Sequence, residues 1–171
     1  MPRVTINLED PSGQSVIKGR WKFATGYIPG EPNEGLIAQG EGSPARLPDY
    51  DDSGWEYCAE LPARISHGFS FVWYRIKITF PDTIGGRNTQ GVRAQFETCV
   101  DDYGEIWIDG ECSRERGVIQ GFNVPQRVQI ADNAVPGEQH CIAVLAANGP
   151  LAAPGGAIHM RYANIAFEWT P

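Results

Sequence analysis

The sequence has no apolar run as long as a membrane span, and its first fourteen residues, MPRVTINLEDPSGQ, lack the apolar core of an export signal. Lysine and arginine are outnumbered, 14 against 21 aspartates and glutamates, and no cluster of them stands out along the chain. A surface with a net charge of −7 repels phosphate backbones and anionic lipids. We therefore expect no nucleic-acid or membrane partner, and a cytoplasmic location if the chain is complete; a chain cut from a longer protein would have lost its signal.

Familiar catalytic and metal-binding motifs are also missing. The sequence contains no G-x-S-x-G, no H-E-x-x-H and no glycine-rich phosphate loop. Its four cysteines, Cys58, Cys99, Cys112 and Cys141, form no Cys-x-x-Cys pair, so we expect no zinc site and predict that all four are reduced. A bridge between Cys99 and Cys141 is the alternative, if the strands that carry them pack face to face.

Helical periodicity is almost absent, whereas short alternating runs recur between glycine, proline, asparagine and aspartate. We therefore predict an all-β chain with less than about one tenth of its residues in helix. Its 171 residues suit a single domain, 1–171, with a real hydrophobic core. Strands are predicted at 19–27, 71–80, 92–100, 105–110, 127–130, 140–148 and 158–169.

The alternation within these runs predicts which faces are buried. In 71–80, Ile76 and its alternate neighbours form an apolar face, while Trp73 and Arg75 lie on the opposite face, as in a sheet with one buried side. We expect the long segment 28–54 to cover this second face. The alternative is a docking surface for a neighbouring domain or a second copy of the chain.

Three further patterns refine the predicted architecture. The run 140–148 is apolar on both faces, which is typical of a central strand. The last run changes parity after Tyr162, so we expect a bulge near Ala163 or Asn164. The Asp-Gly pair at 109–110 predicts a tight hairpin turn. Together they favour a β-sandwich, in the form of a jelly roll.

The order of seven motifs carries more information than any one of them. They are GRWKF at 19–23, DDSGWEYCAELP at 51–62, VWYRIKITFP at 72–81, VDDYGEIWIDGE at 100–111, GFNVP at 121–125, PGEQHCIAVLAANG at 136–149, and the closing run at 158–169. This series resembles the N-terminal sugar-binding domain of glycoside hydrolase family 2, a jelly roll of the galactose-binding-like superfamily. The chain departs from that pattern at Asp109 and Gln139, where the family prefers asparagine. The run VDDYGEIWIDGE, GFNVPQRV (121–128) and NGP resembles still more closely the accessory domains of some gluconolactonase-like β-propeller proteins.

The resemblance implies a function without catalysis. In the family 2 hydrolases the catalytic carboxylates belong to a separate α/β barrel, which this chain is too short to supply. The favoured hypothesis is a non-catalytic carbohydrate-binding-like module, accessory to a glycoside- or lactone-processing enzyme. Its partners would be a carbohydrate or another neutral small molecule, and a catalytic domain or a second copy of the chain.

Two alternatives from other functional classes stay open. One is a small stand-alone enzyme, a lyase, cyclase or hydrolase, with His67 or His159 as the base and Asp101 or Asp102 as its partner. The other is a structural module between domains that only supports a catalytic neighbour.

Sugar recognition requires aromatic faces for C–H surfaces and planar polar groups for hydroxyls. The loop before 71–80 supplies His67 and Phe69, and the loop after 140–148 supplies Asn148 and His159. In the resembled fold these two loops lie at the same edge of the sandwich, and Asn148 matches the asparagine that ends the family's strand there. We expect a ligand-binding edge formed by these residues.

Asp101, Asp102 and Tyr103 could bind sugar hydroxyls, ligate calcium or supply an acid–base pair. Neighbouring residues on a strand point to opposite faces, so the two carboxylates are not expected to meet on one substrate. We expect Asp102 to bond backbone donors where the chain enters the hairpin, and Asp101 to face the accessible edge. Tyr103 and Arg75 complete the predicted ligand-binding set.

The acidic turn with Asp49, Asp51 and Asp52 is a candidate calcium site, because jelly rolls of the resembled superfamily often hold a structural calcium ion. The interpretation that we favour is an ordinary turn that anchors Trp55, since the EF-hand spacing is absent. We expect no other cofactor.

Overall fold

Antiparallel strands make up almost all the regular structure in the computed structural model of the chain, which describes residues 2–32, 42–121, 124–149 and 156–169. Strands account for 48% of the residues and helices for 6%, so the prediction of an all-β chain with little helix is confirmed. The two helical elements described are α1 (Pro11–Val16) and a 3₁₀ turn (Pro44–Arg46). No helix in the described part of the chain is long and apolar enough to cross a membrane.

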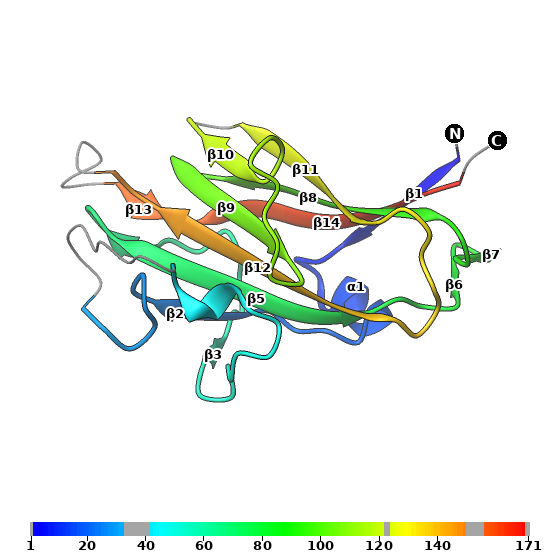
Figure 1. Cartoon of the computed structure of the whole chain (residues 1–171), viewed down its shortest axis with the longest axis horizontal. Helices are drawn as coiled ribbons and strands as arrows, with labels where there is room; N and C mark the ends of the chain where they lie inside the picture. Colours follow the sequence, from blue (N-terminus) through cyan, green and yellow to red (C-terminus); the bar gives the residue numbers. More distant parts are fainter. Residues whose placement is uncertain (1, 33–41, 122–123, 150–155, 170–171) are drawn as a thin grey trace.

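Two antiparallel sheets lie one over the other, with β8, β14 and β1 above β12, β5 and β2 in Figure 1. The four-stranded sheet contains, in spatial order, β1 (Arg3–Asn7), β14 (Met160–Glu168), β8 (Arg93–Val100) and β11 (Pro125–Ala131). The six-stranded sheet contains β10 (Val118–Gln120), β9 (Tyr103–Ile108), β12 (Gln139–Ala147), β5 (Phe71–Thr79), β2 (Lys22–Thr25) and β3 (Glu56–Tyr57). Two small hairpins pair β13 (Ala157–Ile158) with β4 (Ile65–His67), and β6 (Thr83–Ile84) with β7 (Arg87–Asn88).

The main core fills the space between the sheets, where the alternating apolar residues of both sheets meet. Phe96 and Ile165 come from the four-stranded sheet, and Ile76 and Val144 from the six-stranded sheet. Trp21 packs beside Phe96 with the ring centroids 6.1 Å apart. The face of β5 that carries Ile76 is thus the inner face, as the alternation predicts.

A second, smaller core lies on the outer face of the six-stranded sheet. Trp73, Ala143 and Leu145 are buried there beneath Ala45 of the 3₁₀ turn. The indole nitrogen of Trp73 donates a 2.9 Å hydrogen bond to the carbonyl oxygen of Tyr27. The described part of the segment 28–54 therefore covers this face, as expected. Because β12 is buried on both faces and pairs with both β5 and β9, it is the central strand that its apolar sequence predicts.

The turn after β9 follows its sequence closely. Asp109 and Gly110 both have positive φ, 51° and 86°, which is the geometry of the hairpin turn that Asp-Gly favours. Ile108 and Glu111 exchange backbone hydrogen bonds of 2.8 and 2.9 Å across it. No disulfide joins the four cysteines, all of which lie in the described part of the chain.

The predicted bulge near Ala163 or Asn164 is wrong in position. Against β8 the register of β14 shifts between Met160 and Tyr162, so Arg161 is the extra residue. Regular alternation resumes at Ala163, whose small side chain is fully buried. The sequence misplaces the bulge because Tyr162, although aromatic, is only half-buried.

The short helix α1 packs so tightly on the end of β1 that residue 13 has no room for a side chain. A Cβ atom at Gly13 would lie 1.8 Å from the carbonyl oxygen of Asn7. We expect Gly13→Ala to lower the free energy of unfolding by about 1–3 kcal/mol, since this clash outweighs the gain of about 1 kcal/mol in helix propensity. Urea melts check it. Gly149→Ala, where a Cβ would meet nothing within 4 Å, is the control, and equal melts for the two variants would contradict the assignment.

Candidate functional site

The two loops predicted to form a ligand-binding edge do lie side by side. β4, which ends at His67, pairs with β13. The amide of Gly68 donates a 2.9 Å hydrogen bond to the carbonyl oxygen of Gly156, and the amide of Asn148 donates a 3.1 Å bond to that of Ser70. The structure therefore brings the chain before β5 and the chain after β12 to one edge of the sandwich.

Asn148 carries unused hydrogen-bonding capacity at this edge. Its side chain is 1% exposed, and neither the amide nitrogen nor the amide oxygen has a hydrogen-bond partner in the described part of the chain. A buried amide without partners costs about 1–3 kcal/mol.

Asp101 and His159 also meet at this edge. Oδ2 of Asp101 lies 3.7 Å from Nδ1 of His159, and Oδ1 lies 3.9 Å from the guanidinium of Arg161. The Asp101 side chain is only 16% exposed. The structure thus joins two of the predicted site residues, with the carboxylate turned toward the imidazole of His159 and the guanidinium of Arg161 more than toward solvent.

The expected role of Asp102 is wrong. No hydrogen bond to its side chain occurs within the described ranges. Asp102 instead stabilises the turn through its backbone. Asp102 adopts a left-handed conformation with φ of 63°, which aspartate tolerates better than most residues, and its carbonyl oxygen accepts a 2.8 Å bond from the amide of Gly121. Burial and the nearby Asp101 carboxylate raise the pKa of Asp102. Alternation could not predict this, because the turn interrupts the strand.

The two aromatic residues predicted to bind a ligand at this edge, Phe69 and Tyr103, already contact other residues of the chain. Phe69 packs on Phe71 with the ring centroids 5.8 Å apart. The hydroxyl of Tyr103 donates a 2.8 Å hydrogen bond to Glu105. Burial and this carboxylate raise the pKa of Tyr103 far above its ordinary value, so the phenol stays protonated. His67 is exposed and adds an accessible imidazole to the edge.

Arg75 lies inside the molecule, apart from the solvent-facing residues of that edge. Its side chain is 0% exposed, and its Nε donates a 3.0 Å hydrogen bond to Asp52. Its guanidinium also donates to the carbonyl oxygens of Ala45, Leu47 and Tyr50. This candidate ligand-binding residue therefore makes internal contacts that hold the segment after residue 42 on the sheet.

The acidic turn holds its carboxylates apart. Asp52 pairs with Lys22 at 3.1 Å as well as with Arg75, Asp51 accepts a 2.9 Å bond from the amide of Ser53, and Asp49 is exposed. No group of three or more side chains able to hold a metal ion occurs among the described residues. A calcium ion at Asp49, Asp51 and Asp52 stays a prediction, and it would compete with two cations for Asp52.

A groove of about 580 Å³ opens beside this turn, and the sequence did not indicate it. In the short stretch DYDDSGWEY, the aromatic residues Tyr50 and Trp55 flank the polar residues Asp51 and Ser53, and all four line the groove. This cluster of aromatic and polar residues is a sequence signal that could have revealed the groove. The residues that line it are Phe23, Ala24, Thr25, Pro29, Gly30, Tyr50, Asp51, Ser53, Gly54, Trp55 and Glu56.

The ion pair of Asp52 makes stability depend on pH. Burial alone would raise the pKa of Asp52, but the hydrogen bonds and charges of Arg75 and Lys22 outweigh it and hold the pKa below 3.8. A depressed carboxyl pKa contributes stability that is present above 3.8 and is lost as the pH falls through the folded value.

We therefore expect Asp52→Asn to lower the free energy of unfolding by about 2 kcal/mol at about pH 7, and the difference from the unchanged protein to shrink at about pH 3. Urea melts at both pH values measure this. Asp49→Asn, which removes an exposed carboxylate without an ion pair in the described ranges, is the matched control. A difference that is constant with pH would show that the ion pair contributes nothing.

Comparison with known proteins identifies the fold. No family model and no curated protein matches the chain. Among solved structures it is similar to β-glucuronidase 2 of Bacteroides uniformis, with 18% identity and a TM-score of 0.64 over 97% of this chain. A putative β-galactosidase from Bacteroides fragilis gives 17% identity and a TM-score of 0.61 over 98% of this chain. A β-glucuronidase described as a member of glycoside hydrolase family 2 gives 19% identity and a TM-score of 0.59.

The chain spans only 18% of the length of the first of these enzymes and 23% of the second. At such low identity the similarity establishes the fold alone. The fold predicted from the order of the motifs is thus confirmed: the chain is a β-sandwich like the one that forms part of family 2 glycoside hydrolases.

Proposed function

We propose that this chain is a non-catalytic carbohydrate-binding module, accessory to an enzyme that processes glycosides or lactones, and that the groove beside Trp55 holds the sugar. The observation that carries the proposal is the composition of the groove, which combines aromatic faces with carboxylate and hydroxyl groups. Its volume of about 580 Å³ lies within the range of small-ligand sites.

The aromatic wall of the groove is firmly held. The rings of Tyr50 and Trp55 pack at 5.7 Å and 60°. The guanidinium of Arg75 lies 5.6 Å from the centroid of Tyr50 and 5.8 Å from that of Trp55. Rigid rings bind a sugar at a small cost in side-chain entropy, because they lose little freedom on contact.

The polar residues of the groove suit binding better than catalysis. The backbone amide of Ser53 lowers the pKa of Asp51, so this carboxylate stays ionised and accepts hydrogen bonds from hydroxyls. Glycoside hydrolysis needs a protonated carboxylic acid and a second carboxylate across the scissile bond. An aspartate kept ionised is a poor general acid, which supports a module without catalytic activity.

The structural neighbours support the accessory role. They include β-glucuronidases and a protein named a putative β-galactosidase, and the part of each that this chain matches is a minor fraction of the whole. A module of this fold beside a carbohydrate-processing domain would raise the local concentration of sugar near that domain.

We expect a glycan array to identify a bound saccharide, and isothermal titration to show that Trp55→Leu weakens its binding at least about tenfold, or about 1.4 kcal/mol. Leucine keeps apolar bulk against Tyr50 but removes the flat face that a sugar ring contacts. Trp107→Leu is the matched control, because Trp107 is also half-buried and also lies beside guanidinium groups, those of Arg46 and Arg114.

The outcomes separate the proposal from its alternatives. Equal affinity in both tryptophan variants would exclude the groove, and loss of binding in Asn148→Ala alone would place the site at the loop edge. Turnover of a nitrophenyl glycoside by the purified chain would favour the stand-alone enzyme instead.

A further inference from the structure

All three lysines of the chain, Lys18, Lys22 and Lys77, line one pocket of about 290 Å³. Arg20 and Arg75 line it as well, and Asp52 is its one carboxylate among the described residues. Gly19 and Tyr57 complete the lining. Five cationic side chains therefore face a single acid in a protein whose net charge is −7.

The one carboxylate is already used. Asp52 binds Lys22 through Oδ1 at 3.1 Å and Arg75 through Oδ2 at 3.0 Å. Lys18, Arg20 and Lys77 form no ion pair with a carboxylate anywhere in the described ranges, and all three are exposed. The pocket thus keeps three positive charges that the folded chain does not neutralise.

The backbone brings these charges together from three separate elements. Lys22 on β2 lies directly opposite Arg75 on β5, a pairing of like charges that by itself is destabilising. Lys77 is two residues further along the same outer face of β5. At Gly19 a Cβ atom would lie 2.5 Å from the carbonyl oxygen of Lys77. The loop that carries Lys18 therefore packs against the backbone of β5 so closely that residue 19 has no room for a side chain.

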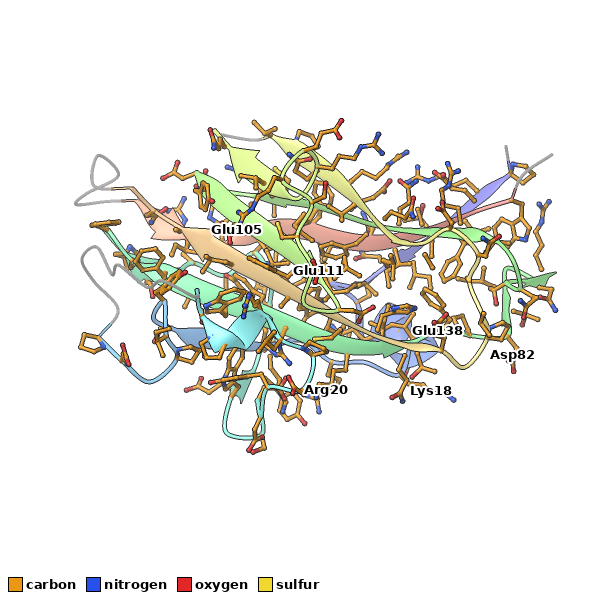
Figure 2. All side chains as sticks on the ribbon, in the orientation of Figure 1. Lys18, Arg20, Asp82, Glu105, Glu111 and Glu138 are labelled. Atoms are coloured by element: carbon orange, nitrogen blue, oxygen red, sulfur yellow. The ribbon has the colours of Figure 1, made fainter. Side chains whose placement is uncertain are left out.

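One of these side chains is oriented by a neighbouring ring. The guanidinium of Arg20 stacks over the ring of Tyr57, 4.0 Å from its centroid, and this contact orients it without neutralising it. Lys18 has a φ of 52°, an unfavourable conformation for a lysine. Lys18 and Arg20 lie along one margin of the molecule, apart from Glu105 and Glu111 (Figure 2).

We propose that this pocket is a binding site for an oxyanion, the carboxylate, sulfate or phosphate group of a small ligand. Ammonium and guanidinium groups together offer many N–H donors to an anion with several acceptor oxygens. A bound anion would offset the mutual repulsion of Lys18, Arg20 and Lys77. The site is separate from the aromatic groove, so the inference does not depend on the proposed sugar site.

Isothermal titration of the whole chain at low ionic strength tests this, with inorganic sulfate, inorganic phosphate, glucuronic acid and uncharged glucose as the four probes. We expect saturable binding of the anions, no heat from glucose in this pocket, and weakening by added sodium chloride because salt screens exposed charges. If glucuronic acid binds at least about tenfold more tightly than both inorganic anions, the source of the anion is an acidic sugar. If the three affinities are equal, the ligand is a free oxyanion.

The variant Lys18→Gln/Lys77→Gln removes two exposed charges that make no ion pair in the described ranges, so folding is expected to be unaffected, and anion affinity should fall at least about tenfold. Arg64→Gln/Arg116→Gln removes the same charge elsewhere on the exposed surface and should leave the affinity unchanged. No binding of any anion, or an equal loss in the two double variants, would overturn the proposal. Heat from glucose that persists in Lys18→Gln/Lys77→Gln belongs to the groove and leaves the anion result unaffected.

Discussion

The contact between Arg75 and the segment that covers it is the constraint on which the rest of the outer face depends. A guanidinium that is fully removed from water costs several kcal/mol unless charges and hydrogen bonds surround it. Here Asp52 supplies the charge and accepts from Nε, and the carbonyl oxygens of Ala45, Leu47 and Tyr50 accept three of the other four N–H groups. Because all four partners belong to one stretch of chain, that stretch cannot leave the sheet without exposing a buried cation to an incomplete set of partners.

Both pockets follow from this contact. Tyr50 and Trp55 form the wall of the aromatic groove, and both lie beside the Arg75 guanidinium. Asp52, from the same segment, and Arg75 line the basic pocket. One buried arginine thus shapes two concave surfaces of opposite character, one aromatic and acidic, the other basic. This division allows the two surfaces to take different chemical groups.

Local patterns in the sequence predicted the features that local physics determines. Alternation identified the inner face of β5 and the central position of β12, and the Asp-Gly pair predicted the turn after β9. The apolar residues on the outer face of β5 required a cover, and the segment 28–54 was long enough to supply it. The order of the motifs predicted the fold, because it reflects the order of strands and turns in the whole sandwich.

Features that depend on contacts between distant parts of the chain could not be predicted in this way. Lys18 and Lys77 are far apart in sequence, and only the approach of the loop at Gly19 to β5 brings them into one pocket. The groove is lined by residues that precede, belong to and follow the segment 28–54 in the sequence. Arg75 has a structural role because it forms an ion pair with Asp52, which is distant in sequence. The conformation of Asp102 and the bulge at Arg161 were not predicted, because each interrupts the strand periodicity that predicts which side chains face the core.

Hydrogen exchange in Arg75→Met tests most directly whether this arginine holds the covering segment. Methionine fills much of the same volume but offers no donors, and Asp52 keeps its bond to Lys22. The amides to follow are those of Leu47, Tyr50 and Trp55, which donate within the segment to the carbonyl oxygens of Pro44, Leu47 and Asp52. We predict that these amides exchange at least about tenfold faster in the variant, while the amides between β5 and β12 stay protected. Unchanged exchange in the segment, or an equal loss of protection throughout both sheets, would contradict it.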